Sequence, residues 1–418
     1  MKRDPAAQGI DEAGEIFACD LHVHIGRSSR DEVVKVTAAR SLTFENIARE
    51  CAVRKGIGVV GIVDCASPAV IRDIEDLLDR GEMTPREGGG LDYRGAVTVI
   101  PGAEFETHEP GGGVSHHLSY FGDVAQLKAF SAAISPHVTN LQLSSQQCRL
   151  PARELLRLAI GCGAVFVPAH AFTPHKSLYG STARRGADLF GDDWGKISAI
   201  ELGLSADSYL ADRIAELADK TFLSNSDAHS LPKIAREYQL VRMQAPTFEE
   251  LGKALRREDG RRVEANYGVD PRLGKYHRTF CEDCQWIARG EPPLRACEQC
   301  GSMRVTMGVL DRIVEIADFE EPQPPSHRAP YRYHMPLQFV PGVGSVTLNR
   351  LLNHFGTEMA VLHQASEEEM ALLVGTKVAH LLALARDGKL HLLAGGGGRP
   401  GRAVSDAKYA LQMGLPGM

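Results

Sequence analysis

The sequence predicts an α/β protein in which a β/α barrel is followed by a four-cysteine module and a helical C-terminal domain. Three observations predict this. Short apolar, β-branched runs alternate with helical patterns from Ile16 to about Met243, four of the nine cysteines are grouped, and residues 334 to about 390 have a helical pattern. A chain of 418 residues is too long for one ordinary core, so two or three domains are expected.

The barrel is expected from seven or eight β/α units. A closed barrel accounts for that number of units, and an open sheet is the alternative. The expected strands are 16–21, 57–63, 96–102, 116–121, 164–169, 198–203 and 221–225, with 238–243 as a possible eighth, and the expected helices are 43–56, 151–163, 208–220 and 249–262.

The composition bounds the class of protein. With 43% hydrophobic and 24% charged residues it is that of a soluble globular protein, and its polar N-terminus lacks the apolar core of a signal peptide. No apolar run reaches the length of a membrane span, so we expect a cytoplasmic protein with no membrane partner. The net charge of -6 gives no overall attraction to nucleic acid. A local patch differs, because no acidic residue lies between Glu321 and Glu358.

Metal-capable side chains stand at the end of nearly every expected strand, which is where barrels of this type place their active site. They are Asp20, His22, His24, Asp64, Glu104, His170, Glu201, Asp227 and His229. Because side chains alternate along a strand, Asp20, His22 and His24 are expected to converge on one side. His116 and His117 instead open their strand, which an antiparallel strand would reconcile.

The mixture of imidazoles and carboxylates suits zinc, manganese or iron. A bridging carboxylate such as Glu104 could hold two ions a few ångströms apart, and two-metal sites of this kind hydrolyse phosphoesters. The stretches DLHVH, the strand end at Asp64, PGAEFE, HHLSYFG, the AH of VFVPAH and NSDAH occur in this order. Together they resemble the PHP (polymerase and histidinol phosphatase) superfamily over residues 16–245, which implies a distorted (β/α)7 barrel with phosphoesterase activity.

The same resemblance implies a set of metal ligands. One ion would be held by His22, His24, Glu104 and Asp227, a second by Glu104, His117 and His170, and a third by Asp64 and His229. Asp64 is followed by CASP, without the histidine that many members carry there. The sequence therefore does not decide whether the third site is fully occupied. We expect two or three divalent ions of zinc, manganese or magnesium. Asp20, Glu201 and Asp227 are the expected catalytic carboxylates, and Glu201 could be a ligand, a proton carrier or a support for a histidine.

The grouped cysteines have the spacing C-x2-C-x12-C-x2-C, close to that of zinc ribbons. They are Cys281, Cys284, Cys297 and Cys300. In a reducing compartment such grouping indicates a metal rather than disulfides. Four thiolates leave no position for a substrate, so we expect one structural zinc; the alternative is two unligated pairs.

A glycine-containing turn precedes the helical pattern of residues 345–356. Gly342 and Gly344, on either side of Val343, would let the backbone approach a neighbour, and the free N–H groups of the helix start would bind phosphate. This resembles the helix-hairpin-helix motif of nonspecific DNA binders, and residues 366–385 look like a degenerate second copy. A plain turn between two helices is the alternative.

The order of these parts, with the stretch HAFTPHKSLYG, is similar to the endonuclease Q family. This resemblance implies a DNA repair enzyme that cuts duplex DNA 5′ of a deaminated base (uracil, hypoxanthine or xanthine) or an abasic site, leaving a 3′-hydroxyl and a 5′-phosphate. The loop 171–196 is the expected substrate contact through Lys176, Tyr179, Arg184 and Arg185, with an ordinary surface loop as the alternative.

Three other functions stay open: a 3′–5′ exonuclease, a small-molecule phosphatase and a non-catalytic DNA-binding accessory protein. The expected parts of the chain are a flexible N-terminus over 1–15, the barrel over 16–265, a zinc-ribbon-like module over 275–320, a proline-rich linker over 321–333, a helix-hairpin-helix-like DNA-binding domain over 334–390 and a disordered tail over 391–418.

Overall fold

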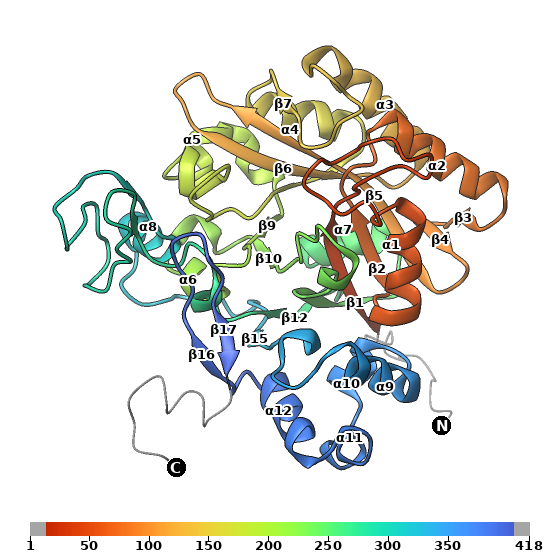
Figure 1. The fold of residues 1–418 in the computed structure, drawn as a ribbon. Coiled ribbons are helices and arrows are strands. Elements are labelled where there is room, and N and C mark those ends of the chain that lie inside the picture. The colour runs from red at the N-terminus through yellow and green to blue at the C-terminus, as the bar shows by residue number, and fades with distance from the viewer. Residues whose placement is uncertain (1–13, 405–418) are drawn as a thin grey trace, which may run out of the picture.

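The computed structural model describes residues 14–404, and its centre is an eleven-stranded mixed sheet (Figure 1). Eight strands follow the order β15-β12-β11-β1-β2-β5-β4-β3, while β6 and β7 pair with β5 and β8 pairs with β6. The bounds are β1 Glu15–Val23, β2 Val59–Ile62, β3 Met83–Pro85, β4 Leu91–Tyr93, β5 Val97–His108, β6 Val114–Tyr120, β7 Gln147–Cys148, β8 Val165–Pro168, β11 Tyr238–Met243, β12 Arg262–Gly268 and β15 Tyr331–Tyr333.

Every strand expected from the sequence is present, but the hydrogen-bonded ladder does not close among the described residues. Strands β9 (Ala199–Glu201) and β10 (Thr221–Leu223) pair in parallel with each other only, as a separate two-stranded sheet. One buried cluster nevertheless takes a side chain from each of eight strands, β1, β2, β5, β6, β8, β9, β10 and β11. The strands therefore share one interior without forming one continuous sheet.

Helices pack against these strands, as the apolar faces of β/α units require. Helix α7, for example, packs on β11 and β12. The bounds are α1 Phe44–Glu50, α2 Pro68–Asp79, α3 Val124–Ile134, α4 Ala152–Gly161, α5 Gly186–Phe190, α6 Ser208–Ala211 and α7 Phe248–Arg256. Within residues 14–404, no helix combines the length and apolar character needed to cross a membrane.

The helix expected over 208–220 is interrupted, and this prediction is wrong. Helix α6 ends at Ala211, and only a short 3-10 turn follows at Ala215–Leu217. The carbonyls of Asp212 and Arg213 accept hydrogen bonds from Gln323 and Asp318 of the later chain instead of continuing a helix. These two carbonyls therefore bond to a distant part of the chain instead of to the next turn of a helix.

The proline-rich stretch 321–333 packs on the α/β part of the chain. Strand β15 adds in parallel to β12, and the buried Arg328 guanidinium lies 2.8 Å from Asp212 and over the ring of Phe222. The four-cysteine module before it contains β13 (Phe280–Cys281), β14 (Val305–Thr306) and α8 (Val309–Ile316). Helices α9 (Ser345–Phe355), α10 (Glu358–His363), α11 (Glu367–Val374) and α12 (Thr376–Arg386) follow.

The tail expected to be disordered over 391–418 is ordered in its first part. Strands β16 (His391–Leu393) and β17 (Arg402–Val404) form a hairpin, drawn in Figure 1 as a ribbon that runs toward the four-cysteine module. Its glycine-rich turn donates backbone hydrogen bonds to the carbonyls of Arg272 and Leu273. The glycines that suggested disorder allow this close approach. Residues 405–418, and residues 1–13 of the expected flexible N-terminus, lie outside the described residues.

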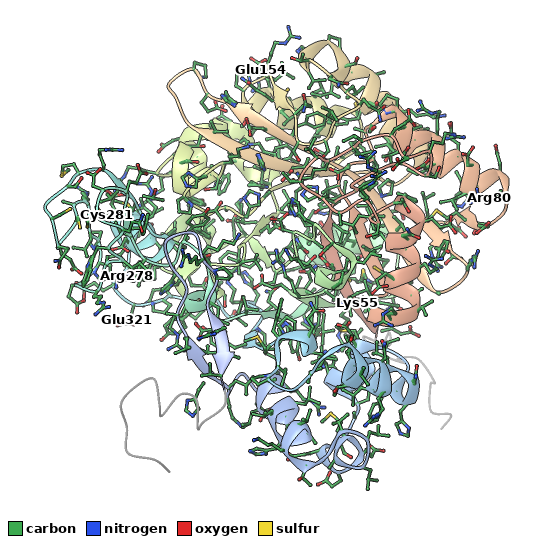
Figure 2. The ribbon with its side chains drawn as sticks, viewed as in Figure 1. Lys55, Arg80, Glu154, Arg278, Cys281 and Glu321 are labelled. Carbon is green, nitrogen blue, oxygen red and sulfur yellow. The ribbon has the colours of Figure 1, made fainter. Side chains whose placement is uncertain are left out.

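A buried ion pair joins the α/β part of the chain to the C-terminal helices, at the boundary where Figure 2 labels Lys55. The Lys55 ammonium lies 2.8 Å from Glu358 Oε1 and donates to the carbonyl of Pro232. Both side chains are almost fully buried. Removing one partner of such a pair leaves the other charge unpaired.

We therefore expect Lys55→Met to lower the free energy of unfolding by about 3 kcal/mol. The double variant Lys55→Met, Glu358→Leu should recover most of that loss, because no buried charge remains. Chemical denaturation followed by circular dichroism measures both, with Lys128→Met, at an exposed ion pair with Glu75, as the control that changes little. Equal destabilisation by Lys55→Met and Lys128→Met would contradict the expectation.

Candidate metal centre

The carboxyl ends of the strands bring two groups of metal-capable side chains together. The first contains His22 and His24 at the end of β1 and Asp227 after β10, with donor atoms all within 4.8 Å of one another. The Nε2 atoms of the two histidines are 3.2 Å apart, and Asp227 Oδ1 is 3.3 Å from His24 Nε2. The sequence expectation that these three residues meet is consistent with this geometry.

The second group contains Glu104 of β5, His116 of β6 and His170 after β8. Glu104 Oε1 lies 3.0 Å from His116 Nδ1 and 3.7 Å from His170 Nε2. The same carboxylate lies 3.5 Å from His22 Nε2 and 3.7 Å from His24 Nε2. Glu104 is thus placed between the two groups, as expected of a bridging carboxylate.

His117 was the expected ligand in the second group, and the structure corrects this to His116. Strand β6 runs antiparallel to β5, with His116 opposite Glu106 and His117 opposite Phe105. Since neighbouring side chains point to opposite faces, only His116 shares the face of Glu104. On the other face, His117 packs against Phe166, and its Nε2 is hydrogen-bonded to the hydroxyls of Ser115 and Thr107. Burial lowers the pKa of His117 to about 3, so it stays neutral.

Three further carboxylates lie behind the histidines. Glu201 accepts a hydrogen bond from His22 Nδ1 at 3.0 Å, and Glu106 accepts one from His116 Nε2 at 3.2 Å. Asp64 lies 3.1 Å from His24 Nδ1. A carboxylate behind an imidazole fixes its orientation and which nitrogen faces the metal. Of the roles that the sequence left open for Glu201, this geometry matches support for a histidine, and Asp64 lies in the same position behind His24.

Among the described residues, no group of metal-donor side chains is formed for the expected third ion. Neither Asp64 nor His229 belongs to a group of three donor side chains. The carboxylate of Asp64 also accepts from the Ile25 amide and from Ser144. The ring of His229 is tilted against that of His24 with ring centroids 4.6 Å apart, and burial, followed by the charge of His24, lowers the pKa of His229 to about 4.

Asp20 does not converge with the histidines, which corrects a catalytic assignment. The pairing of β1 with β2 shifts register between Asp20 and Val23, so the regular alternation of side chains is broken there. Asp20 instead accepts hydrogen bonds from the backbone N–H groups of Ser226 and Ala235, at 3.0 and 2.8 Å. It holds the loop that presents Asp227.

The electrostatics of the first two groups favour cations. Burial opposes ionisation of Glu104, but His116 and Lys35 outweigh it and hold its pKa well below the usual range. Burial lowers the pKa of His22, but Glu201 and Glu104 outweigh it and hold that pKa well above the usual range. Without a metal ion, the histidines of the site therefore favour binding protons at the atoms that could bind metal ions.

The donor geometry also fits a metal. Each Nδ1 of His22 and His24 faces a carboxylate, so each Nε2 directs its lone pair into the same space. The two Nε2 atoms are 3.2 Å apart, so this space can hold a shared proton or a metal ion. Imidazoles and carboxylates together match zinc or manganese better than magnesium.

The loop 171–196 only partly matches its expected role in substrate contact. Tyr179 is fully buried, stacks on Phe172 and donates its hydroxyl to Glu216, so it belongs to the core. Arg184 and Arg185 donate to the carbonyls of Glu315 and Ile316, next to the end of α8. An apolar or cationic side chain in a loop can either pack against the protein or contact a ligand, and the local sequence does not distinguish these roles.

Lys176 keeps a half-exposed ammonium, 2.7 Å from Glu106 at the edge of the second group. Sequence reasoning missed Glu106, although its position two residues after Glu104 on one strand was a usable signal. It also missed Lys35, Ser144 and Ser145, which contact the ligand and orienting carboxylates from loops. No periodicity marks such loop residues.

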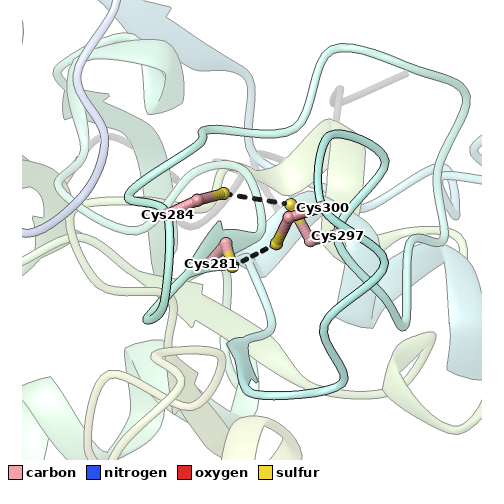
Figure 3. A group of neighbouring side chains, drawn as sticks. All are labelled: Cys281, Cys284, Cys297 and Cys300. Atoms are coloured by element: carbon pink, nitrogen blue, oxygen red, sulfur yellow. Dashed lines mark hydrogen bonds between the residues drawn. The ribbon is translucent and has the colours of Figure 1, made fainter.

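The four cysteines form the third group of donors, and Figure 3 shows their side chains turned toward one another. Sγ of Cys281 lies 3.7 Å from that of Cys300, and Sγ of Cys284 lies 3.5 Å from that of Cys297. These separations are far longer than a disulfide bond and suit four thiolates around one tetrahedral ion.

We expect Glu201→Gln to lower the affinity of the first group for its metal by roughly 10- to 100-fold. Glutamine keeps the size of the side chain but removes the charge that orients and polarises His22. Metal affinity is measured by competition with a chelator, and Glu264→Gln, at a partly exposed carboxylate that pairs with Arg242 and Arg262, is the control. An unchanged affinity in Glu201→Gln would show that Glu201 does not support His22.

Comparison with known proteins places this fold and site in a family. No family model matches the chain. It is 44% identical over 393 residues to the uncharacterized protein YqxK of Bacillus subtilis, covering 93% of this chain and 99% of YqxK. It is 35% identical over 255 residues to the uncharacterized protein MJ0043 of Methanocaldococcus jannaschii, of which it covers 31%.

Two solved structures are similar over almost the whole chain. The lesion-specific endonuclease PfuEndoQ of Pyrococcus furiosus is 32% identical with a TM-score of 0.79, covering 94% of this chain and 96% of that one. Endonuclease Q in complex with a 27-mer duplex substrate that has an abasic lesion at the active site is 33% identical, also with a TM-score of 0.79. By sequence and by fold, this chain is an enzyme of the endonuclease Q family of metal-dependent nucleases.

Proposed function

We propose that this protein is a DNA repair endonuclease that hydrolyses the phosphodiester bond 5′ of a deaminated base or an abasic site. The deaminated bases are uracil, hypoxanthine and xanthine, and the products carry a 3′-hydroxyl and a 5′-phosphate. The observation that carries the proposal is the pair of donor groups joined by Glu104, in a chain one-third identical to an endonuclease Q that holds abasic duplex DNA at its active site.

Two divalent ions would occupy the barrel site. His22, His24 and Asp227 would hold one, while Glu104, His116 and His170 would hold the other. When bound, such ions supply Lewis acidity that activates water and stabilises a departing oxygen. The residues of the chain fix that arrangement through the carboxylates behind His22, His24 and His116, and through Thr173 behind His170. The four cysteines would hold a structural zinc.

The C-terminal helices would hold the DNA backbone. Helix α9 starts after Gly342, Val343 and Gly344, and α12 starts after Gly375; neither start has a side-chain cap, so its N–H groups are open to a phosphate. Gly342 and Gly375 both have positive φ, and a Cβ on Gly342 would lie 3.2 Å from Val378 of α12. The two helix starts are therefore neighbours, which supports a pair of phosphate-binding hairpins.

Within this pair of hairpins the three residues of the first turn have different roles. Val343 is buried and anchors the turn, whereas the backbones of Gly342 and Gly344 would face the DNA. Lys176, beside the metal site, would contact the substrate there. We retain the division into a barrel over 16–265, a zinc module over 275–320 and a DNA-binding domain over 334–390 as part of the proposal.

A cleavage assay tests the function. End-labelled duplexes with one uracil, hypoxanthine, xanthine or abasic site are incubated with the protein and manganese, zinc or magnesium, beside an undamaged duplex. A single metal-dependent cut 5′ of the lesion is expected, with no cut in the undamaged duplex. Fragments that shorten from one end would indicate an exonuclease instead. Duplex binding without cleavage would indicate an accessory protein, and failure to bind any duplex would favour a small-molecule phosphatase.

A further inference from the structure

Lys35 places a positive charge at the metal centre, where nothing in the sequence pattern predicted one. It lies on the loop that connects β1 to α1, and its Nζ is 3.2 Å from Glu104 Oε2 and bonded to Ser145 Oγ. Among the described residues, Lys35 is the one lysine or arginine that forms an ion pair with Glu104, Asp227 or Asp64. Its position is therefore specific to this site.

The backbone around Lys35 is fixed from both sides. Its own N–H and that of Val34 donate to the carbonyl of Gly26, while the Val34 carbonyl accepts from Ser144. Gly26 has no room for a side chain, since a Cβ there would lie 2.1 Å from the carbonyl oxygen of Ala39. These contacts fix the backbone of the loop at Lys35, although the lysine side chain itself has a flexible stem.

The ammonium lies on the outer side of Glu104. The Lys35 side chain is 12% exposed, whereas that of Glu104 is 1% exposed. A phosphodiester bound to ions beside Glu104 would therefore lie within reach of this ammonium. Lys35 contacts a ligand carboxylate directly, whereas Glu201 and Asp64 lie behind histidines.

Glu104 does not need Lys35 to satisfy its hydrogen bonds. One carboxylate oxygen faces His116, and the other already accepts a hydrogen bond from Ser145. Lys35 has three N–H groups, and the structure gives partners to two of them among the described residues. One donor is left for a substrate oxygen.

We propose that Lys35 is a catalytic residue that donates a hydrogen bond to a non-bridging oxygen of the scissile phosphate and stabilises the negative charge that develops there. The assignment deepens the proposed function and rests on it for the identity of the substrate. An ammonium aimed at developing charge in a water-poor site acts more strongly than in bulk water. Lys35 neither gives up nor accepts a proton in this role, because it acts as a fixed charge.

Three variants test the assignment: Lys35→Met removes the charge at similar length, Lys35→Arg keeps it, and Lys128→Met is a matched change at an exposed ion pair far from the site. In Lys35→Met we expect the barrel ions to remain bound. Orthophosphate should bind the metal-loaded variant roughly tenfold more weakly than the wild type. Single-turnover cleavage of uracil-containing duplex should fall about 100-fold. Lys35→Arg should recover part of both losses, and Lys128→Met should match the wild type.

Two outcomes would overturn the assignment. Unchanged orthophosphate binding and unchanged cleavage in Lys35→Met would show that the ammonium does not meet the phosphate. Loss of the barrel ions from that variant, measured by elemental analysis, would make Lys35 a neutralising partner of Glu104 instead. The orthophosphate measurement is independent of lesion cleavage. If the wild type cuts no lesion but Lys35→Met still loses phosphate binding, the proposed function fails while the phosphate contact stands.

Discussion

The variant with both His22→Asn and His24→Asn should lose lesion cleavage by roughly 1,000-fold or more, equivalent to about 4 kcal/mol of transition-state stabilisation. Asparagine places its amide near the position of Nδ1, so it can still donate to Glu201 and Asp64. It has no atom at the position of Nε2, where the two histidines face each other. The change therefore removes metal ligands and retains the hydrogen bonds behind them.

Three measurements follow that variant. Elemental analysis should show fewer barrel ions with the zinc of the four cysteines retained, single-turnover kinetics should show the loss of rate, and the melting temperature should show that the fold persists. His137→Asn is the control, because His137 belongs to none of the donor groups in the described chain. Cleavage at the wild-type rate in the double variant would exclude this site as the catalytic centre.

Replacing Cys281 and Cys300 with serine should release one zinc per chain and unfold the segment from about residue 280 to 306. Strands β13 and β14 have two residues each, and few side chains between them are buried, so a bound metal would supply most of the stability of this segment. Apparent binding free energies of structural zinc are about 10–16 kcal/mol in small modules. Without the ion, that stabilisation is absent.

The unfolding should stop before α8. Asp311 of that helix pairs with Arg278 at 3.1 Å and accepts from the Thr279 amide, and Arg312 donates to the carbonyl of Tyr179. Limited proteolysis should therefore cut within residues 282–304 and leave α8 protected, while Cys162→Ser, at a cysteine outside the cluster, should retain zinc and resist cleavage. Equal zinc content in the wild type and the double serine variant would contradict the structural role.

The order of chemical groups along the chain was readable from the sequence. Strand ends carried the histidines and carboxylates, since a buried apolar run followed by a polar ligand is a local pattern. The cysteine spacing likewise predicted a cluster that the structure brings together. Both features depend only on residues that are near neighbours in the chain.

The roles of individual side chains were decided by the tertiary structure. Alternation along β6 shows that one of His116 and His117 faces the site, but only the pairing with β5 decides which. Asp64 was expected to be a metal ligand and Glu201 a catalytic carboxylate until the histidines in front of them were placed. Lys35 carries no pattern at all, because its position depends on a loop held by Gly26 and Ser144. Local sequence fixes which groups a strand offers, whereas contacts between distant segments decide which atoms meet, because those contacts depend on the packing of the whole chain.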